Sequence, residues 1–382
     1  MQRNTTISIC KGIAIILMVM GHASCPGRLN SFFYEFHMPL FFCTAGFFFS
    51  TKYLNDEATF VKRRLKGLYL PFVKWSVLFL LLHNLFFKLG ILNEQYGNSA
   101  GGVTHPYTWH IMQQRLWNIV TSMGSYDEFI AGAFWFFRAL LVASLLYLVL
   151  FKLFNRLLSL CGKSSEGDDR HPLSQSVRTK AVAVLICITT LLLAAWQTSE
   201  GLRISTLVQG GYRDIMGTFF FGCGFLFSRY KEEYKATWWT TALLFAVTLL
   251  FSLYASACME WRTTFANFLK LPIPALCGTL MVYNVSLWID KKECIVKRFL
   301  VYCGNNTLCI LVFHILSFKV VSLLKVWCYG LDYLQIGSHL VVHVNESTDG
   351  FWILYTIVGV GLPLASTFLY RKAAAHISST IR

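Results

Sequence analysis

The sequence has little charge for its length. Of its 382 residues only 14% are charged, against about 25% in a soluble domain, whereas 55% are hydrophobic and 16% are aromatic. This balance excludes an ordinary soluble protein and indicates an integral membrane protein. The net charge of +15 would suit nucleic acid, but the basic residues fall in short clusters between apolar runs, where membrane topology accounts for them. We therefore expect no nucleic-acid binding.

The sequence also lacks closely spaced cysteine motifs and a signal-peptide cleavage site. The 12 cysteines form no C-x-x-C pair and no Cys/His spacing typical of zinc. Most lie inside apolar runs, where a free thiol behaves as a small hydrophobe, so we expect no metal site. The first apolar run lacks an A-x-A site, and we interpret it as a retained membrane span rather than a signal peptide.

Apolar runs of about 20 residues, the length that crosses a bilayer as a helix, recur along the chain. Their number predicts an all-α fold, a polytopic membrane bundle of about ten transmembrane helices. The expected spans lie near 7–25, 32–50, 68–89, 132–151, 180–197, 214–228, 238–258, 272–289, 301–321 and 351–370.

The distribution of the 34 Lys and Arg residues predicts the orientation of these spans. Most of them fall in the segments that a ten-span topology with both termini inside places on the cytoplasmic side, which agrees with the positive-inside rule. We detect no internal repeat and expect residues 1–382 to form a single transmembrane domain. The polar segment 162–180 is expected to be a cytoplasmic linker within it.

Ionisable residues inside spans are costly and are candidates for function. In the predicted topology His22, His37, Arg138 and His314 come from four spans and lie in the outer half of the membrane. A membrane histidine is about as often merely bonded to a neighbouring helix, and this alternative stays open for His37 and His314. Arg138 suits an anion-holding or structural role, since arginine stays protonated. His22 has the strongest case, because imidazole is the natural general base for a hydroxyl.

The stretch KGIAIILMVMGH places Lys11 and His22 eleven residues apart. In a helix this spacing returns to nearly the same face after a rise of about 16 Å, about half of the hydrocarbon core. Farther along, FVKRRLKGLYLP gathers four basic residues before the third span. Such a cluster can simply orient the protein, and Lys11 can simply snorkel. The sharper interpretation is an anion site, because guanidinium groups clamp phosphates.

Several motifs together resemble the membrane-bound acyltransferase 3 family, in particular its fucose 4-O-acetylase-like branch. Lys11 to His22 is similar to the family's basic-x10-His motif. FHMPLFF at 36–42, followed by Ala45-Gly46-Phe47, resembles the branch's second motif. The segment from Arg63 to Pro71 resembles R-x-x-R-x-x-x-P, with Lys66 where the second arginine usually stands. Weaker matches are Trp135-Phe136-Phe137 and the Gly304-Asn305-Asn306-Thr307-Leu308 segment that ends at His314.

The resemblance implies transfer of an acyl group, typically from acetyl-CoA, to a hydroxyl of a cell-surface or lipid-linked carbohydrate at a bacterial inner membrane. It also implies that Arg63, Arg64 and Lys66 hold the phosphates of the donor, with its pantetheine arm passing Lys11. His22 would be the general base, His37 would assist it or the acceptor, and Arg138 would stabilise the oxyanion. His314 and Asn305 are further candidates. Anionic membrane lipids are expected partners of the basic inner face.

Three alternatives remain open at this point. An acyl-histidine intermediate is compatible with the same residues. A glycan transporter or flippase would also carry charges inside the membrane, although such proteins often show repeated halves. A membrane glycosyltransferase would need an acidic base in an outer loop, for which Asp127 and Glu128 are the candidates.

Overall fold

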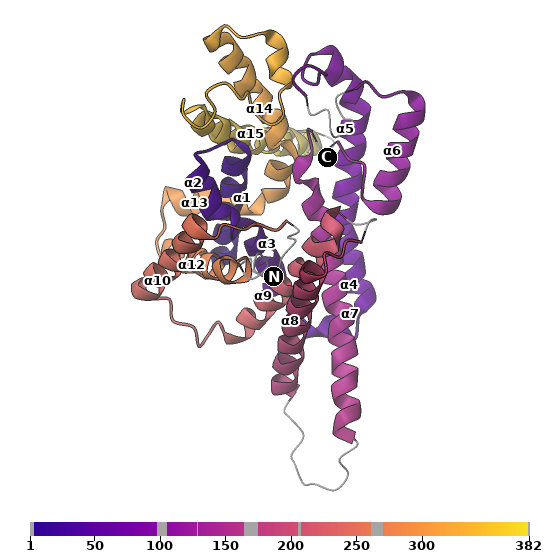
Figure 1. Ribbon diagram of the computed structural model, residues 1–382, viewed down its shortest axis with the longest axis vertical. Coiled ribbons are helices and arrows are strands. Elements are labelled where there is room, and N and C mark those ends of the chain that lie inside the picture. The colour runs from indigo at the N-terminus through magenta and orange to yellow at the C-terminus, as the bar shows by residue number, and fades with distance from the viewer. Residues whose placement is uncertain are drawn as a thin grey trace. The chain divides into compact units, whose positions relative to one another are not determined.

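The computed structural model describes residues 4–97, 105–127, 129–163, 175–204, 208–260 and 270–380. These residues form an all-α structure (Figure 1), as the sequence predicts. The chain divides into two compact units. The first comprises 1–33, 70–135 and 288–382, and the second comprises 34–69 and 136–287. Each unit is therefore assembled from segments that are far apart in the sequence.

The first unit contains most of the N-terminal and C-terminal helices. Asn4 begins its first helix, because its side chain accepts a hydrogen bond from the Ile7 amide. The elements of this unit are α1 (Thr5–His22), α2 (Gly27–Tyr34), α5 (Leu70–Lys88), α6 (Trp109–Ser122), η4 (Gly132–Phe134), α13 (Ile295–Asn305), α14 (Thr307–Tyr329), η6 (Tyr333–Gly337) and α15 (Phe351–Thr380).

The second unit contains the middle of the chain. A capping box between Thr237 and Thr240 fixes the start of one of its helices. The elements of this unit are α3 (His37–Phe47), η1 (Thr51–Leu54), α4 (Glu57–Arg64), the π-helical η2 (Leu65–Tyr69), α7 (Trp135–Lys163), α8 (Gln175–Ser199), η5 (Val208–Gly211), α9 (Tyr212–Tyr230), α10 (Trp238–Tyr254) and α12 (Pro272–Asp290).

Glycines allow the closest helix crossings in both units. Gly12 of α1 lies against the Leu300 carbonyl of α13, and Gly304 lies against the Ser8 carbonyl. Any side chain at either glycine would collide with backbone. Gly46 and Gly224 make the equivalent approach between α3 and α9. Small residues at such crossings are typical of membrane helices, whose backbones gain van der Waals contact by approaching closely.

Seven helical segments of the described chain are long and apolar enough to cross a membrane. They correspond to seven of the ten expected spans, so the expectation of a multi-pass membrane protein is confirmed. The other three expected spans are interrupted or short. The region 32–50 breaks between α2 and α3 at Glu35 and Phe36, α10 has 17 residues, and α9 carries Arg213 and Asp214 in its first turn.

The expected linker 162–180 is described only at its ends. Helix α7 continues to Lys163, and helix α8 begins at Gln175. Residues 164–174 lie outside the described residues. The ends of α7 and α8 are tied together, because the Arg178 guanidinium donates to the carbonyl of Asn155.

Candidate active site

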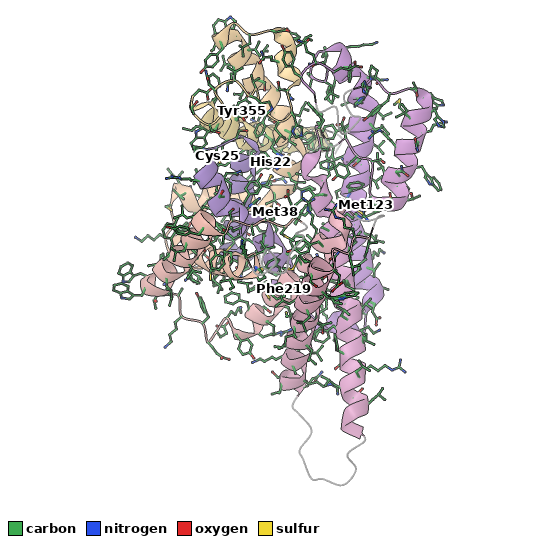
Figure 2. All side chains as sticks on the ribbon, viewed as in Figure 1. His22, Cys25, Met38, Met123, Phe219 and Tyr355 are labelled. Carbon is green, nitrogen blue, oxygen red and sulfur yellow. The ribbon has the colours of Figure 1, made fainter. Side chains whose placement is uncertain are left out.

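Two predicted residues from opposite ends of the sequence meet in the first unit. Nδ1 of His22 lies 2.8 Å from Nε2 of His314, and the two imidazole rings are nearly parallel, with centroids 5.0 Å apart. His22 is the last residue of α1 and is half-buried (Figure 2). His314 lies in the second turn of α14 and is fully buried. The pair therefore has one imidazole inside the unit and one nearer its surface.

Backbone contacts fix the tautomers of this pair. Nδ1 of His314 lies 3.1 Å from the Ile310 carbonyl and 3.0 Å from the Leu311 carbonyl. Carbonyls only accept, so this nitrogen carries a proton. A buried imidazole without a carboxylate at either nitrogen is neutral, and its Nε2 is then an acceptor. His22 must donate its Nδ1 proton to that acceptor, which leaves the lone pair of neutral His22 on Nε2.

Neighbouring contacts hold the end of α1 in place. The Ala23 amide donates to the carbonyls of Val19 and Met20 and ends the helix. The next residue, Ser24, has a positive φ of 55°, and its carbonyl accepts a hydrogen bond of 2.8 Å from the Ser347 hydroxyl. His22 thus projects from a helix end that is anchored to a C-terminal segment of the same unit.

Lys11 and Asn305 lie on the two helices that cross at Gly12. Lys11 is half-buried on α1, the helix that ends at His22. Asn305 ends α13 and accepts a hydrogen bond of 3.3 Å from the Ser8 hydroxyl. This contact therefore joins helix α1 to helix α13.

His37 and Arg138 belong to the second unit. His37 begins α3, is 3% exposed, and meets the Tyr34 ring edge-on at 4.8 Å. Arg138 is half-buried near the start of α7 and lies within electrostatic range of Asp214, which is 7% exposed in α9. Arg213 faces the same carboxylate. The sequence analysis missed this counter-charge, although Asp214 is an acidic residue in an expected span.

The basic cluster spans the end of α4 and the π-helical turn after it. Arg63 donates to the Tyr53 hydroxyl at 2.6 Å. The Arg64 guanidinium lies over the rings of Phe60 and Phe221, 5.0 and 5.5 Å from their centroids. Such stacking uses the face of the guanidinium and leaves the donors on its edge directed away from the rings. Lys66 is exposed in the π-helical turn, a local widening that is frequent at functional sites.

A second buried histidine site in the first unit was missed. His83 of α5 is fully buried, with Nδ1 2.9 Å from Oδ2 of Asp127 and Nε2 2.9 Å from the His105 carbonyl. Its ring stacks on Tyr107 at 3.5 Å. The His105 carbonyl can only accept, so Nε2 of His83 carries a proton. A second proton lies between Nδ1 of His83 and the Asp127 carboxylate, and the His83–Asp127 pair is neutral as a whole. The rule that selected His22 applies equally to this histidine.

Asp127 is held by several further groups. Its Oδ1 accepts from the amides of Phe129 and Ile130, and the buried Lys319 lies within electrostatic range of it. The Lys319 ammonium donates to the carbonyls of Ile336 and Ser338 at 3.0 and 2.7 Å. Asp127 thus has structural partners on every side, whereas Glu128, the other acid considered for glycosyl transfer, lies outside the described residues.

The whole length of the candidate site region matches one known protein family. A model of the acyltransferase 3 family, described as an acyltransferase domain, matches residues 4–371. The chain belongs to this family. The comparisons with curated proteins and with solved structures return no match. Membership makes the protein a multi-pass membrane acyltransferase, and an acyltransferase requires an acyl donor and an acceptor.

The acyltransferase match covers both units, including every candidate residue. Within the matched region, a hydrogen bond joins His22 to His314. Arg63 and Arg64 end α4, and Lys66 lies in the π-helical turn that follows directly. Among the residues that the structure describes, no three His, Cys, Asp or Glu side chains are placed to hold a metal ion.

Proposed function

We propose that the protein is an O-acyltransferase of the bacterial inner membrane. It moves an acyl group, most simply acetyl, from acyl-CoA to a hydroxyl of a cell-surface or lipid-linked carbohydrate, and His22 acts as general base. The observation that carries the proposal is the 2.8 Å contact between Nδ1 of His22 and Nε2 of His314, whose own Nδ1 faces backbone carbonyls. A proton fixed on Nδ1 leaves Nε2 as the basic atom, which is what the removal of a hydroxyl proton needs.

The reaction balances with one histidine. Nε2 of His22 accepts the hydroxyl proton as the oxygen attacks the thioester carbonyl, and a tetrahedral oxyanion forms. Its collapse expels the CoA thiolate, which takes the proton back from His22, so an ester and free CoA leave. The imidazolium that exists between the two steps is supported by the Nδ1–H bond to His314, because that acceptor is stronger toward a charged donor.

The roles of the other candidates rest on sequence and family. Arg63, Arg64 and Lys66 would hold the phosphates of the donor, and Lys11 would line the path of its pantetheine arm. The guanidinium edges of Arg63 and Arg64 fit phosphate oxygens in geometry and in charge. His37 would assist the acceptor and Arg138 would stabilise the oxyanion. The basic cytoplasmic segments also favour contact with anionic lipids.

Radiolabelled acetyl transfer tests the proposal. Membranes containing equal amounts of wild type, His22→Ala or His110→Ala receive labelled acetyl-CoA, and label is counted in the glycan fraction. His110 is an exposed histidine of α6 in the same unit and serves as the control. We expect label with wild type and His110→Ala only. Equal label with His22→Ala would remove His22 from the reaction.

The alternatives give different results in the same membranes. Label retained on the protein when acceptor is withheld would support an acyl-histidine intermediate. Accumulation of glycan across the membrane, with no acetyl label in any sample, would support the transporter or flippase.

A further inference from the structure

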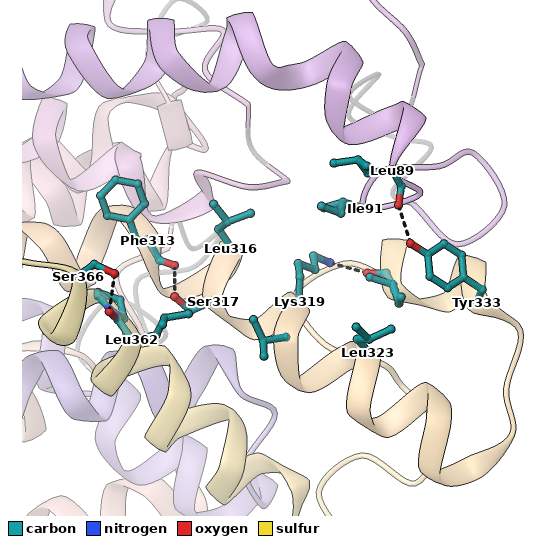
Figure 3. Close-up of a pocket in the computed structure, with 13 residues that line it drawn as sticks. Leu89, Ile91, Phe313, Leu316, Ser317, Lys319, Leu323, Tyr333, Leu362 and Ser366 are labelled. Atoms are coloured by element: carbon teal, nitrogen blue, oxygen red, sulfur yellow. Dashed lines mark hydrogen bonds between the residues drawn. The ribbon is translucent and has the colours of Figure 1, made fainter. Parts of the chain in front are cut away.

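A groove in the first unit runs along the face of α14. It has a volume of about 530 Å³ and lies between α14, α15 and the chain that follows α5 (Figure 3). We call it the α14 groove and define it by Phe313, Ser317, Val320, Leu323, Leu362 and Ile336. Its volume falls in the range of about 300–1,000 Å³ that is typical of small-molecule sites.

The polar atoms of the groove are already satisfied by the protein. The hydroxyl of Ser317 donates to the Phe313 carbonyl, that of Ser366 to the Leu362 carbonyl, and that of Tyr333 to the Leu89 carbonyl, each at 2.9 Å. Figure 3 draws these bonds, together with the bond from the Lys319 ammonium to the Ile336 carbonyl. The buried Lys319 ammonium also lines the groove and donates to the carbonyls of Ile336 and Ser338. These polar groups are therefore bonded within the protein, and the rest of the wall is hydrocarbon. A ligand of this groove must be apolar.

The groove has a buried floor and an exposed rim. Ser317 and Ile336 on the floor are 5% and 3% exposed, whereas Val320, Leu323 and Leu362 on the rim are 56%, 51% and 43% exposed. Helices α14 and α15 both have the length and hydropathy of membrane spans. The medium at the rim is therefore the hydrocarbon of the bilayer rather than water.

An empty groove of this size would be unfavourable. Atoms lining a void lose dispersion contacts on one side, and a flexible chain that fills the void restores them. Bilayer phospholipid supplies such chains at far higher concentration than any acceptor lipid, and mass action favours the abundant ligand. Because the polar groups of the groove are already bonded to carbonyls of the protein, a glycan-bearing lipid gains no advantage there.

We propose that the α14 groove binds one acyl chain of a bilayer phospholipid as a specific site. The chain lies against Phe313, the neighbour of His314, and fills the space between α14 and α15. This binding site is independent of the proposed transfer reaction and does not require that the reaction be assigned correctly.

Photo-crosslinking tests the proposal on the full-length protein in vesicles of phosphatidylethanolamine and phosphatidylglycerol. The probe is a phosphatidylethanolamine with a diazirine on one acyl chain. Ser317→Phe fills the floor, and Leu362→Trp fills the rim should the first variant not fold. Ile357→Trp is the control, because Ile357 is an exposed residue of α15 outside the groove lining. Native mass spectrometry of the detergent-purified proteins then identifies any retained lipid.

We expect strong labelling of the α14 peptide in wild type and Ile357→Trp, with most of it lost in the groove-filling variant. We also expect one retained phospholipid mass that the same variant loses. Labelling spread evenly over the exposed helices and unchanged by filling would overturn the proposal. A retained fatty acid or lipid-linked saccharide in place of phospholipid would overturn it as well.

Discussion

The two histidine sites of the first unit, at His22 and at His83, differ in burial and in the partners of the imidazole ring. His22 contacts another imidazole, is half-buried, and has its proton fixed on one nitrogen by a chain of hydrogen bonds that ends at backbone carbonyls. His83 contacts a carboxylate, is fully buried, and faces an acceptor at each nitrogen. The first arrangement joins two imidazoles and is the one to which we assign acid–base chemistry, whereas the second bonds both ring nitrogens of His83 to acceptors from other segments of the unit.

The difference teaches that the partner, not the residue type, decides what a membrane histidine does. A neutral partner such as His314 orients the ring without neutralising the charge that it acquires as a base. A carboxylate such as Asp127 holds the proton in place, and its removal would leave an unpaired polar group in the interior. Substitutions at the two sites should therefore separate activity from stability.

The largest effect is expected for His22→Ala. Loss of a general base lowers a transfer rate by about 10²–10⁴-fold. The substitution leaves Nε2 of the buried His314 without its donor, so we expect the free energy of unfolding to fall by about 1–3 kcal/mol, less than at His83. Acetyl transfer per mole of folded protein and thermal unfolding in detergent measure the two quantities. If His22→Ala lost stability in proportion to activity, the proposed difference between the His22 and His83 sites would be wrong.

His83→Ala should show the reverse behaviour. Breaking a buried ion pair by removing one partner costs about 3–5 kcal/mol, so the unfolding midpoint should fall sharply while the specific activity of the folded fraction stays near wild type. The double variant His83→Ala with Asp127→Ala should recover part of the loss, because the unpaired carboxylate is gone. Activity that falls with no change in stability would place His83 in the reaction.

Substitutions at His314 sharpen the comparison. His314→Leu removes the acceptor that orients His22, and we expect transfer to fall about 10- to 100-fold, the usual cost of losing an orienting partner. His314→Gln retains an acceptor oxygen and should restore part of the rate, with the same affinity for the donor. Equal rates in the two variants would show that the acceptor has no role.

Arg64→Ala should act on the donor rather than on the chemistry. A lost hydrogen bond between charged groups costs about 1.5–3 kcal/mol, so we expect the KM for acetyl-CoA to rise at least tenfold with kcat nearly unchanged. Arg156→Ala, which removes an exposed arginine from α7 of the same unit, is the control. Steady-state kinetics in membranes distinguish the two, and a fall in kcat alone would argue against phosphate binding.

The smallest effect is expected for Asn305→Ala. Its side chain accepts the long hydrogen bond from the Ser8 hydroxyl, and an ordinary hydrogen bond contributes about 1 kcal/mol. Stability should fall by that amount with transfer unchanged. A large loss of acetyl transfer in this variant would show that Asn305 has a functional role beyond helix packing.

Periodicity and composition predicted much of this fold. Seven expected spans coincide with helices that can cross a membrane, because hydropathy over 20 residues is a local property of the chain. The break at Glu35 and Phe36 and the π-helical turn at 65–69 were not visible, since such irregularities depend on packing rather than on composition.

The candidate residues also divide into those that a local pattern indicates and those whose partners depend on tertiary structure. The proximity of His22 and His314 agrees with the predicted topology, which places both residues in the outer half of the membrane. The Asp127 partner of His83 lies in a segment between helices, and the Asp214 counter-charge of Arg138 lies in a different helix. Pairings between distant segments are set by tertiary structure, and one sequence alone does not reveal them.

The central claim is that the His22 imidazole removes the hydroxyl proton. Chemical rescue tests it most directly. Acetyl transfer by His22→Ala is measured with increasing imidazole in the buffer, since the substitution vacates the volume of the imidazole ring. The account predicts that imidazole restores transfer in this variant in a concentration-dependent way and leaves wild type unchanged. Full activity of His22→Ala without imidazole would contradict it.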